Sequence, residues 1–304
     1  MNYHIPVLLN ESVNGLSIKP NGIYIDLTFG GGGHTKHILD KLETNGKLFS
    51  FDTDNDSINI NSIIRKKNFE LIDSNFKYFD MHLQQRGIKK VDGILADLGV
   101  SSHQLDTKSR GFSYKGKSKL DMRMNSNNKK SAQTILNTYE ESELSKIFFD
   151  YGDFKNSKRI AKSIIEYRKK NKIKYNSDLI EILNNLFNKK VNYKFLSRLF
   201  QSIRIEVNDE INVLKEMLIK TKDMLNPKGR LVVISYHSIE DRLVKNFINK
   251  SNFESIYKTD FYGNRKLFFN RIYKKPLIPS TDEIKLNPRS RSAKLRVGEL
   301  IWIN

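Results

Sequence analysis

The sequence predicts an α/β protein with an open parallel sheet, interrupted by a helical insertion and completed by the C-terminal part of the chain. Short apolar runs alternate with helical patterns from residue 22 to about residue 100. A glycine-rich turn, Gly30–Gly33, follows the first of these runs. The same rhythm returns at Leu231–Ser235, beyond a mainly helical stretch at residues 105–211.

The first part of the chain contains four predicted strands. A helical pattern at His34–Leu42 separates the first two, and Gly46 is its predicted stop. Strands that alternate with helices imply right-handed crossovers, so their carboxyl ends meet at one edge of the sheet, where ligands bind in such folds. The four runs are Ile23–Leu27, Lys47–Phe51, Phe69–Ile72 and Val91–Ala96.

The middle of the chain differs in character. Residues 103–130 are polar and rich in Gly, Ser, Asn and Lys, which predicts a loop. Thr138 with Glu141 matches a capping box, and Ser157 and Ser177 are predicted to cap two further helices. A single long helical pattern then spans residues 200–218.

The C-terminal part returns to strands. The turn at residues 225–230 leads into Leu231–Ser235, an apolar run typical of a buried strand. Glu254–Thr259 and Lys266–Tyr273 flank Gly263-Asn264 and predict a hairpin, and Ala293–Val297 predicts a last strand. We therefore expect a discontinuous core at residues 1–104 and 212–304, with an inserted helical domain at residues 105–211.

Composition narrows the function. The 304 residues include 53 Lys+Arg and 34 Asp+Glu, a net charge of +19, and no Cys. The lack of Cys excludes a disulfide scaffold, a Cys zinc site and thiol catalysis. The charge favours a polyanionic partner, nucleic acid ahead of a membrane surface, although a basic solvated face is the simpler alternative. No run reaches the roughly 20 apolar residues of a membrane span, and the start lacks the features of a secretory signal, so we expect a cytoplasmic protein.

The glycine-rich turn and Asp52 together predict a nucleotide-like ligand. Asp52 ends the second strand, 20 residues after Gly32, where an acidic side chain accepts hydrogen bonds from ribose hydroxyls. Thr35 replaces the third glycine of GxGxxG, and no Gly-Lys-Ser/Thr follows. The pattern does not separate a dinucleotide from another adenosine cofactor, so an NAD-dependent oxidoreductase stays open.

Two further sites carry candidate chemistry. Asp97 ends the fourth strand and would face the same edge, unless it caps the next segment. The run Ser235–Arg242 follows the fifth apolar strand and contains His237, two carboxylates and a guanidinium. His34 and His37 lie at helical spacing without an evident third ligand, so no metal site is expected.

These blocks together resemble one family closely and over essentially the whole chain: the bacterial ribosomal RNA small subunit methyltransferase H family. The most specific are Leu120-Asp121-Met122-Arg123-Met124 and Val100-Ser101-Ser102-His103-Gln104-Leu105-Asp106. The others are His4–Glu11, Tyr24–Gly30 with Gly32–His34, Asp92–Gly99, Arg110–Ser113, Phe200-Gln201, Arg204-Ile205, Val207–Glu210, Ser235–Arg242 and Asn287–Ser292.

The resemblance implies a Rossmann-like class I S-adenosylmethionine-dependent methyltransferase sheet. It implies methylation of N4 of a cytidine in the decoding region of 16S ribosomal RNA, with the inserted domain helping to bind RNA. The implied cofactor contacts are Gly32, Gly33 and His34 at the methionine end and ribose, Asp52 at the ribose hydroxyls, Phe76 near the adenine, and Asp97 and Gln104 to complete the pocket.

The sequence departs from the family at two places in the insertion, Tyr151–Phe154 and Lys194–Leu199. A family run that ends in two glutamates is replaced at the first, and a His-Pro-Ala-Thr-Arg-like run at the second. Both departures bear on RNA contacts rather than on the cofactor.

For the reaction, we expect Asp97 to accept a hydrogen bond from the target amino group and His237 to take the surplus proton. Basic and aromatic residues such as Tyr114 interleave in the predicted loop, as RNA contact requires, although a solvated loop fits equally well. An RNA-binding scaffold without chemistry is a further alternative, and the sequence leaves open the oligomeric state and whether naked RNA or an assembled subunit is the substrate. The predicted RNA-binding arginines are Arg110, Arg123, Arg198, Arg289 and Arg291.

Overall fold

The computed structural model describes residues 6–54, 66–257, 259 and 261–301. The chain forms two compact units, one of residues 1–99 with 211–304 and one of residues 100–210. Each unit is described by itself below. The block His4–Glu11 lies partly outside the described residues, because residues 1–5 are not among them.

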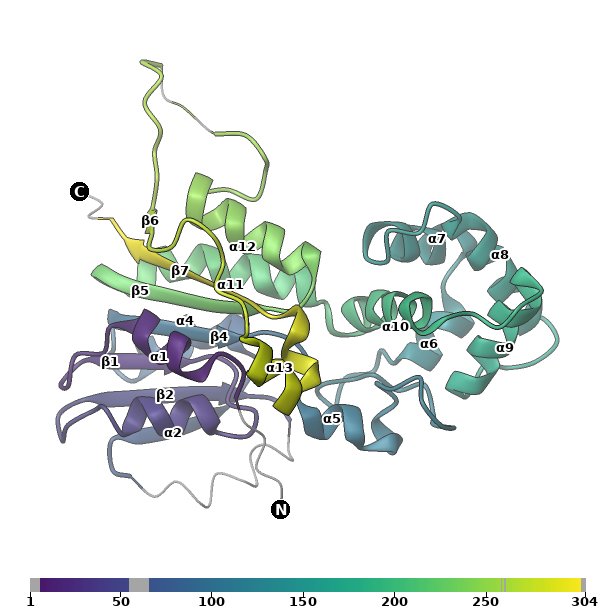
Figure 1. The fold of residues 1–304 in the computed structure, drawn as a ribbon, viewed down its shortest axis with the longest axis horizontal. Coiled ribbons are helices and arrows are strands. Elements are labelled where there is room, and N and C mark those ends of the chain that lie inside the picture. Colours follow the sequence, from purple (N-terminus) through teal and green to yellow (C-terminus); the bar gives the residue numbers. More distant parts are fainter. Residues whose placement is uncertain (1–5, 55–65, 258, 260, 302–304) are drawn as a thin grey trace. The chain divides into compact units, whose positions relative to one another are not determined.

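The first unit is built on a seven-stranded sheet in the order β3-β2-β1-β4-β5-β7-β6 (Figure 1). Strands β1 to β5 are parallel, and β7 is antiparallel to both of its neighbours. The predicted parallel sheet and the return of a strand after the insertion are thus confirmed. The strands are β1 (Ile23–Asp26), β2 (Lys47–Asp52), β3 (Phe69–Asp73), β4 (Val91–Asp97), β5 (Leu225–Ser235), β6 (Phe269–Arg271) and β7 (Lys294–Leu300).

The predicted hairpin around Gly263-Asn264 is wrong in its pairing. Strand β6 pairs with β7, and in the described part of the hairpin segment only an isolated bridge joins Thr259 to Arg265. Residues 254–257 are exposed and bury no face, whereas Phe269 is fully buried. Burial of Phe269 therefore fixes this strand on the sheet; Lys258 and Asp260 lie outside the described residues.

Helices cover both faces of the sheet. In α1 (Leu9–Leu16), a Cβ on Gly15 would lie 2.9 Å from the side chain of Val297. The next residue on β7, Gly298, instead faces Ile248 of α12 (Ser238–Lys250). Because neighbouring strand residues point to opposite faces, α1 and α12 lie on opposite sides of the sheet. The core beneath α1 and α2 contains Tyr24, Leu48, Leu95, Val232, Leu295 and Val297.

The first unit contains further helices besides α1 and α12. Helix α2 covers Gly33–Leu39 and so ends earlier than the predicted Leu42. The others are the 3₁₀ helix η2 (Phe76–Tyr78), α4 (Phe79–Gln85), α11 (Glu210–Met224), α13 (Thr281–Leu286) and the 3₁₀ helix η4 (Pro288–Ser292).

The second unit is mainly helical and has its own apolar core. The core includes Phe112, Leu120 and Met122, although residues 103–130 were predicted as a polar loop. These few apolar side chains are buried although the backbone around them is largely irregular. The segment is therefore part of a packed unit rather than a solvated loop. Its helices are α5 (Ser102–Asp106), the 3₁₀ helix η3 (Lys108–Arg110), α6 (Ala132–Thr138), α7 (Glu141–Asp150), α8 (Ser157–Arg168), α9 (Asn176–Phe187) and α10 (Tyr193–Asn208).

The predicted helix caps need correction. Thr138 ends α6, and the capping box of α7 is formed by Glu140 with Glu143. Ser157 is the first residue of α8 rather than its cap. Ser177 lies inside α9, whose cap is Tyr175.

The long helical pattern at residues 200–218 is two helices. Asp209 has φ 53°, a left-handed conformation that ends α10, and α11 begins at the next residue. A single left-handed residue leaves the apolar residues before and after it at helical spacing, so the sequence pattern does not reveal the break between the two helices. Among the described residues, no helix is long and apolar enough to cross a membrane.

Candidate active site

The glycine-rich turn after β1 exposes backbone to a potential ligand. Gly30 and Gly32 have φ of +51° and +73°, which favour glycine, and the Gly32 N–H donates to the Phe29 carbonyl at 2.7 Å. A Cβ on Gly31 would meet nothing within 4 Å. The turn therefore leaves open space beside its backbone, as a bound cofactor requires.

Asp52 fastens this turn from the end of β2. Its Oδ2 accepts from the Gly30 N–H at 2.8 Å, and Oδ1 accepts from Thr53 and Asp54 N–H groups at 2.8 and 2.9 Å. Burial raises the pKa of Asp52 despite these bonds. A carboxylate offers about four acceptor sites, so one remains for a ligand hydroxyl. The predicted ribose-binding residue is thus also a structural tie of the turn.

A buried carboxyl that sequence reasoning missed lies under the turn. Asp26, the last residue of β1, accepts from the Thr35 hydroxyl at 2.7 Å and from the Thr28 N–H at 3.1 Å. The Thr35 hydroxyl also lies 2.8 Å from the Ser50 hydroxyl. Burial raises the pKa of Asp26 to about 6. The available signal was an acidic residue within the apolar run Ile23–Leu27.

The N-terminal segment packs against the turn. A Cβ on Gly33 would lie 2.1 Å from the Pro6 ring, so only glycine fits there. The buried His34 ring meets the Val7 carbonyl through Nε2 at 3.2 Å, and the Leu8 N–H donates to Glu283 at 2.8 Å. His34 is therefore held in place, with Nδ1 3.9 Å from Oδ2 of the next site residue, Asp97.

Asp97 ends β4 and belongs to the same edge of the sheet. Its N–H donates to the Thr28 hydroxyl at 2.7 Å, and its Oδ1 accepts from the Tyr236 hydroxyl at 2.8 Å. Burial raises the pKa of Asp97 to about 7; the Tyr236 hydrogen bond opposes this shift, and Asp26 and Glu240 add to it. The following helix is capped by Ser101, so Asp97 is not its cap.

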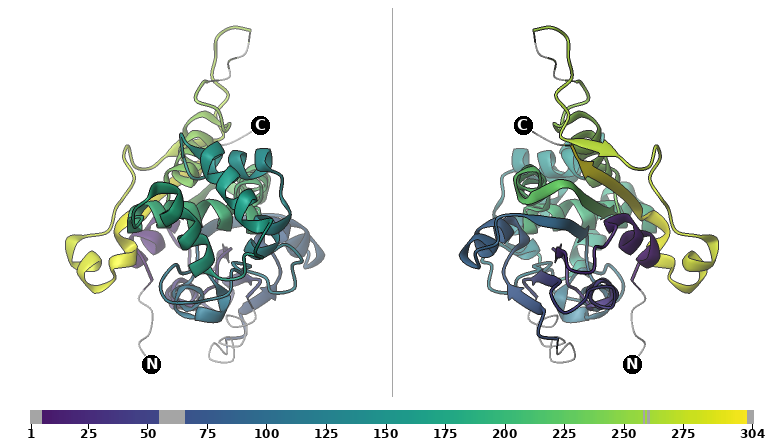
Figure 2. Two further views of the ribbon diagram at one scale, coloured as in Figure 1. Left: turned by 90° about the vertical axis from the view of Figure 1, so that its right-hand side faces the viewer. Right: turned by 90° about the vertical axis from the view of Figure 1, so that its left-hand side faces the viewer.

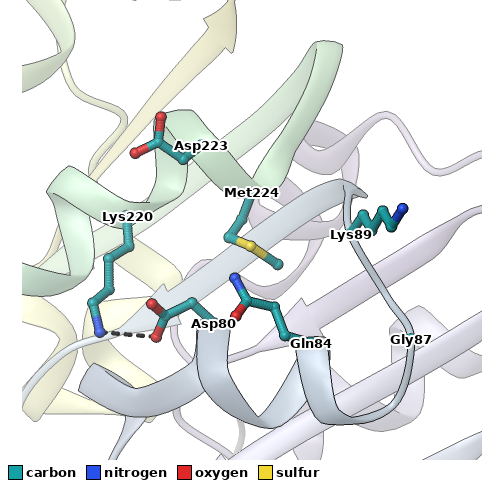
Figure 3. Close-up of a pocket in the computed structure, with 7 residues that line it drawn as sticks. All are labelled: Asp80, Gln84, Gly87, Lys89, Lys220, Asp223 and Met224. Carbon is teal, nitrogen blue, oxygen red and sulfur yellow. Dashed lines mark hydrogen bonds and ion pairs between the residues drawn. The ribbon is translucent and has the colours of Figure 1, made fainter.

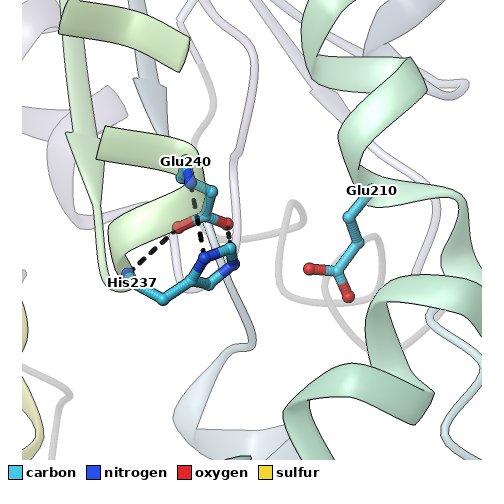
Figure 4. A group of neighbouring side chains, drawn as sticks. All are labelled: Glu210, His237 and Glu240. Atoms are coloured by element: carbon cyan, nitrogen blue, oxygen red, sulfur yellow. Dashed lines mark hydrogen bonds and ion pairs between the residues drawn. The ribbon is translucent and has the colours of Figure 1, made fainter. Parts of the chain in front are cut away.

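His237 and Glu240 are engaged with each other (Figure 4). His237 caps α12, where its Nδ1 accepts from the Glu240 N–H at 3.4 Å. Its buried Nε2 lies 3.0 Å from Glu240 Oε1 but forms no hydrogen bond among the described residues. Glu240 Oε2 accepts from the Tyr236 N–H at 3.0 Å. Because Nδ1 is an acceptor here, the neutral ring carries its proton on Nε2. Both ring nitrogens thus face Glu240, whereas a proton acceptor needs one that is open.

The other two charged residues of the predicted run Ser235–Arg242 are Asp241 and Arg242, and each has its own surroundings. Asp241 pairs with Arg296 at 2.7 Å and Lys294 at 3.3 Å, both on β7. Arg242 is exposed. The Asp241 carboxylate therefore ties α12 to the sheet.

The other predicted cofactor residues occupy different positions. Phe76 is half-buried and begins η2, just after β3 ends at the same sheet edge. Gln104 lies in the second unit, where its side chain accepts from the Ser101 N–H at 3.1 Å and completes the α5 capping box. Within the first unit, the structure thus assembles the glycine turn, His34, Asp52 and Asp97.

Three of the predicted RNA-binding arginines bind their own chain. Arg110 donates to the carbonyls of Arg123 and Met124, and Arg123 pairs with Asp121 at 2.8 Å. Arg198 donates to the Gly152 carbonyl at 2.9 Å. A guanidinium held by carbonyl or carboxylate groups has fewer donors for phosphate.

The last two predicted arginines lie in the C-terminal part of the chain. Arg289 and Arg291 are exposed on η4.

Two features of the first unit are separate from this edge. A surface hollow is lined by Asp80, Gln84, Gly87, Lys89, Lys220, Asp223 and Met224 (Figure 3). Lys89 lies two residues before β4 and Met224 directly precedes β5, so the hollow lies at the amino ends of these strands. Ligands of such sheets bind at the carboxyl ends. His37, considered above with His34, meets the Gly33 carbonyl at 3.1 Å.

The strand order with an antiparallel β7, the glycine turn after β1 and the acidic end of β2 define a Rossmann-like class I methyltransferase. The chain belongs to the MraW methylase family, whose model matches residues 1–301. It is 50% identical over 301 residues to "Ribosomal RNA small subunit methyltransferase H" of Flavobacterium johnsoniae, with 99% of each chain covered. The protein of that name from Christiangramia forsetii is 50% identical over 298 residues, with 98% of each covered. That from Phocaeicola vulgatus is 47% identical over 297 residues, with 98% of this chain and 97% of the relative covered.

The family expectation from the sequence is therefore confirmed. The protein is a methyltransferase, and S-adenosylmethionine is its methyl donor. The open backbone at Gly31, the acceptor Asp52 and the half-buried carboxyl of Asp97 fit this donor, which carries ribose hydroxyls and positive charge. The oxidoreductase and the noncatalytic scaffold are accordingly not supported.

Proposed function

We propose that this enzyme transfers a methyl group to the exocyclic N4 of a cytidine in the decoding region of 16S ribosomal RNA. The observation that carries the proposal is the 50% identity, over nearly the whole chain, to a ribosomal RNA small subunit methyltransferase H. The substrate is 16S ribosomal RNA, within the small ribosomal subunit, and the enzyme works in the cytoplasm.

The donor is held by the residues around the glycine turn. S-adenosylmethionine supplies a methyl group on a sulfonium that is already activated for in-line displacement. The backbone of Gly32 and Gly33 with His34 binds its methionine end and ribose, and Asp52 accepts from a ribose hydroxyl. Phe76 contacts the adenine.

Asp97 acts on the amino group. The N4 lone pair is delocalised into the cytosine ring, so the amine is a poor nucleophile. A carboxylate that accepts a hydrogen bond from this amino group favours a pyramidal nitrogen and disperses the charge that develops as the methyl group arrives. Tyr236 holds one oxygen of Asp97, which leaves the other to face the amine.

The surplus proton then leaves N4. We expected His237 to take it, but both nitrogens of that ring face Glu240 in the free protein. Asp97 has a pKa of about 7, which suits a group that gains and loses a proton near neutral pH. We assign the proton to Asp97 first and to water next, with His237 supporting α12 as its cap.

The target base must leave its stack to come within about 3–3.5 Å of the methyl group. Residues 265–296 include ten basic and two acidic residues, among them the exposed Arg289 and Arg291. The side chains of Arg289 and Arg291 contact phosphate groups. Affinity for RNA therefore falls steeply as salt is raised.

The test is methyl transfer to small subunits from cells that lack the gene. Purified enzyme is incubated with labelled S-adenosylmethionine and either these subunits or naked 16S ribosomal RNA, and the nucleosides are analysed by mass spectrometry. N4-methylcytidine in the decoding region is expected. Label only in another nucleoside, or none in either substrate, would overturn the proposal.

A further inference from the structure

Two segments of the second unit are strongly basic. Residues 107–120 contain five basic and no acidic residues, and residues 189–198 contain four basic and no acidic residues. Arg110 and Arg198 donate to backbone carbonyls, as described above. The other seven side chains are exposed lysines: Lys108, Lys115, Lys117, Lys119, Lys189, Lys190 and Lys194.

A pair of tyrosines joins the two segments. The rings of Tyr114 and Tyr193 stack with centroids 5.8 Å apart and an interplanar angle of 28°. Tyr114 is anchored on its other side by an edge contact with Phe200 of the buried core at 5.9 Å, and by the Ser197 hydroxyl, which donates to it at 3.3 Å. Tyr193 is 66% exposed.

The position of Tyr193 is fixed by the helix that it begins. It is the first residue of α10, and the side chain of Asn192 caps this helix by accepting from the Phe195 N–H at 2.8 Å. The ring is therefore presented at an ordered helix start. A large aromatic ring that is so exposed does not serve the core of this unit.

We propose that the Tyr114–Tyr193 pair is a stacking platform for an unpaired base of small-subunit ribosomal RNA, with the surrounding lysines binding the adjacent phosphates. An exposed ring offers its face to any base that is not already stacked in a duplex. Cationic side chains without acidic neighbours favour a phosphate backbone over a neutral partner. The inference rests on the proposed function for the identity of the RNA and adds a binding site to it.

The structure offers a matched pair of variants for the test. Tyr193→Ala removes the exposed ring of the platform. Phe149→Ala removes a ring that is 58% exposed on α7 of the same unit, next to Asp150 and away from the basic segments in sequence. Both positions are on the surface, and urea unfolding at the wild-type denaturant concentration in both variants reports that the fold is intact.

Binding is measured by fluorescence anisotropy with a labelled single-stranded 12-nucleotide oligouridylate and a 12-base-pair RNA duplex. Loss of one base stack in Tyr193→Ala is expected to weaken single-strand binding about 5- to 150-fold. Tyr193→Trp is expected to keep the single-strand affinity, and Phe149→Ala to bind both RNAs as wild type does. In Tyr193→Ala, duplex binding is expected to change less than single-strand binding. Equal losses in Tyr193→Ala and Phe149→Ala, or none in either, would overturn the platform.

The lysines are tested through salt. In Lys190→Gln/Lys194→Gln, the dependence of log affinity on log salt for the single strand is expected to flatten by about 0.7 for each lysine. An unchanged slope contradicts their contact with phosphate.

Methylation separates this site from the proposed function. With small subunits as substrate, Tyr193→Ala is expected to raise KM for the subunit more than it lowers kcat. If wild-type enzyme transfers no methyl group to ribosomal RNA, the proposed function fails. If wild type is active and Tyr193→Ala keeps its RNA affinity and KM, the platform alone fails. A change of oligomeric state with unaltered RNA affinity would instead make this surface a contact between copies and overturn the proposal.

Discussion

The hydroxyl of Tyr236 donates a 2.8 Å hydrogen bond to Oδ1 of Asp97 and joins the ends of β5 and β4. Burial and the neighbouring Asp97 charge raise the pKa of Tyr236 well above its ordinary value, so this phenol stays a donor throughout the working pH range. Asp97 is also faced by His34 of α2, by Asp26 of β1 and by Glu240 of α12. Tyr236 therefore lowers the pKa of Asp97 as a neutral hydrogen-bond donor, whereas the carboxylates of Asp26 and Glu240 raise it.

Tyr236→Phe is expected to shift the pH dependence of methyl transfer. The hydrogen bond lowers the Asp97 pKa, so its loss makes the carboxylate harder to form. A hydrogen bond to a charged group contributes about 1.5–3 kcal/mol, which moves the acid limb of the pH–rate profile upward by about 1–2 units. Tyr273→Phe, at an exposed tyrosine, is the control. An acid limb at the wild-type pH in Tyr236→Phe would show that this bond does not act on the reaction.

Asp97→Asn separates cofactor binding from chemistry. A cationic ligand prefers the ionised carboxyl, so S-adenosylmethionine affinity in wild type is expected to fall about tenfold for each pH unit below the Asp97 pKa of about 7. In the variant the affinity is lower at pH 8 and nearly independent of pH. Calorimetry from pH 5.5 to 8.5 measures both.

The second readout of Asp97→Asn is the single-turnover rate at saturating cofactor. Loss of a general base lowers this rate by about 10²- to 10⁴-fold. A variant that binds the cofactor weakly but turns over at the wild-type rate would restrict Asp97 to cofactor binding.

Asp26→Asn is expected to change how stability depends on pH. The pKa of Asp26 is raised from 3.8 to about 6 in the folded state, so its stabilising contribution is complete below pH 3.8 and is lost as the pH rises through 6. At pH 8 the ionised buried carboxyl costs up to about 3 kcal/mol. Asn can accept from the Thr28 N–H and donate to the Thr35 hydroxyl, so urea unfolding should find the variant at least as stable as wild type at pH 8. It should also lose less stability than wild type between pH 4 and 7, and parallel pH curves for the two proteins would contradict this account.

The sheet could be predicted because its signals are local. Each apolar run and the glycine turn are read from adjacent residues, and β1 to β4 lie where these runs are. Strand β5 contains the predicted run Leu231–Ser235 but begins at Leu225, within the predicted turn. The position of Asp52 at the end of β2 also follows from its spacing to the glycine turn. Thr138 and Glu141 have the same spacing as Glu140 and Glu143, and only packing of α6 and α7 decides which pair caps a helix.

The contacts that were missed join distant segments. Tyr236 and Asp97 are 139 residues apart in the sequence. No sequence pattern around a tyrosine at the end of a strand predicts which residue its hydroxyl contacts. Arginines are similar: a guanidinium donates to a carbonyl or to phosphate according to what the fold brings near, so Arg198 and Arg291 are indistinguishable by sequence. The geometry of His237 with Glu240 likewise depends on where α12 begins.

Arg198 and Arg291 should therefore respond oppositely to substitution. Arg198 donates to the Gly152 carbonyl and lies 4.7 Å from the centre of the Phe154 ring, contacts that hold α10 to the residues after α7. Arg198→Lys loses the planar fork and is expected to destabilise the protein by about 1–3 kcal/mol in urea unfolding. Arg291→Gln, at an exposed site, should leave stability unchanged and flatten the salt dependence of RNA binding by about 0.7–0.9. If Arg198→Lys is as stable as wild type, the carbonyl contacts of Arg198 are dispensable for the fold.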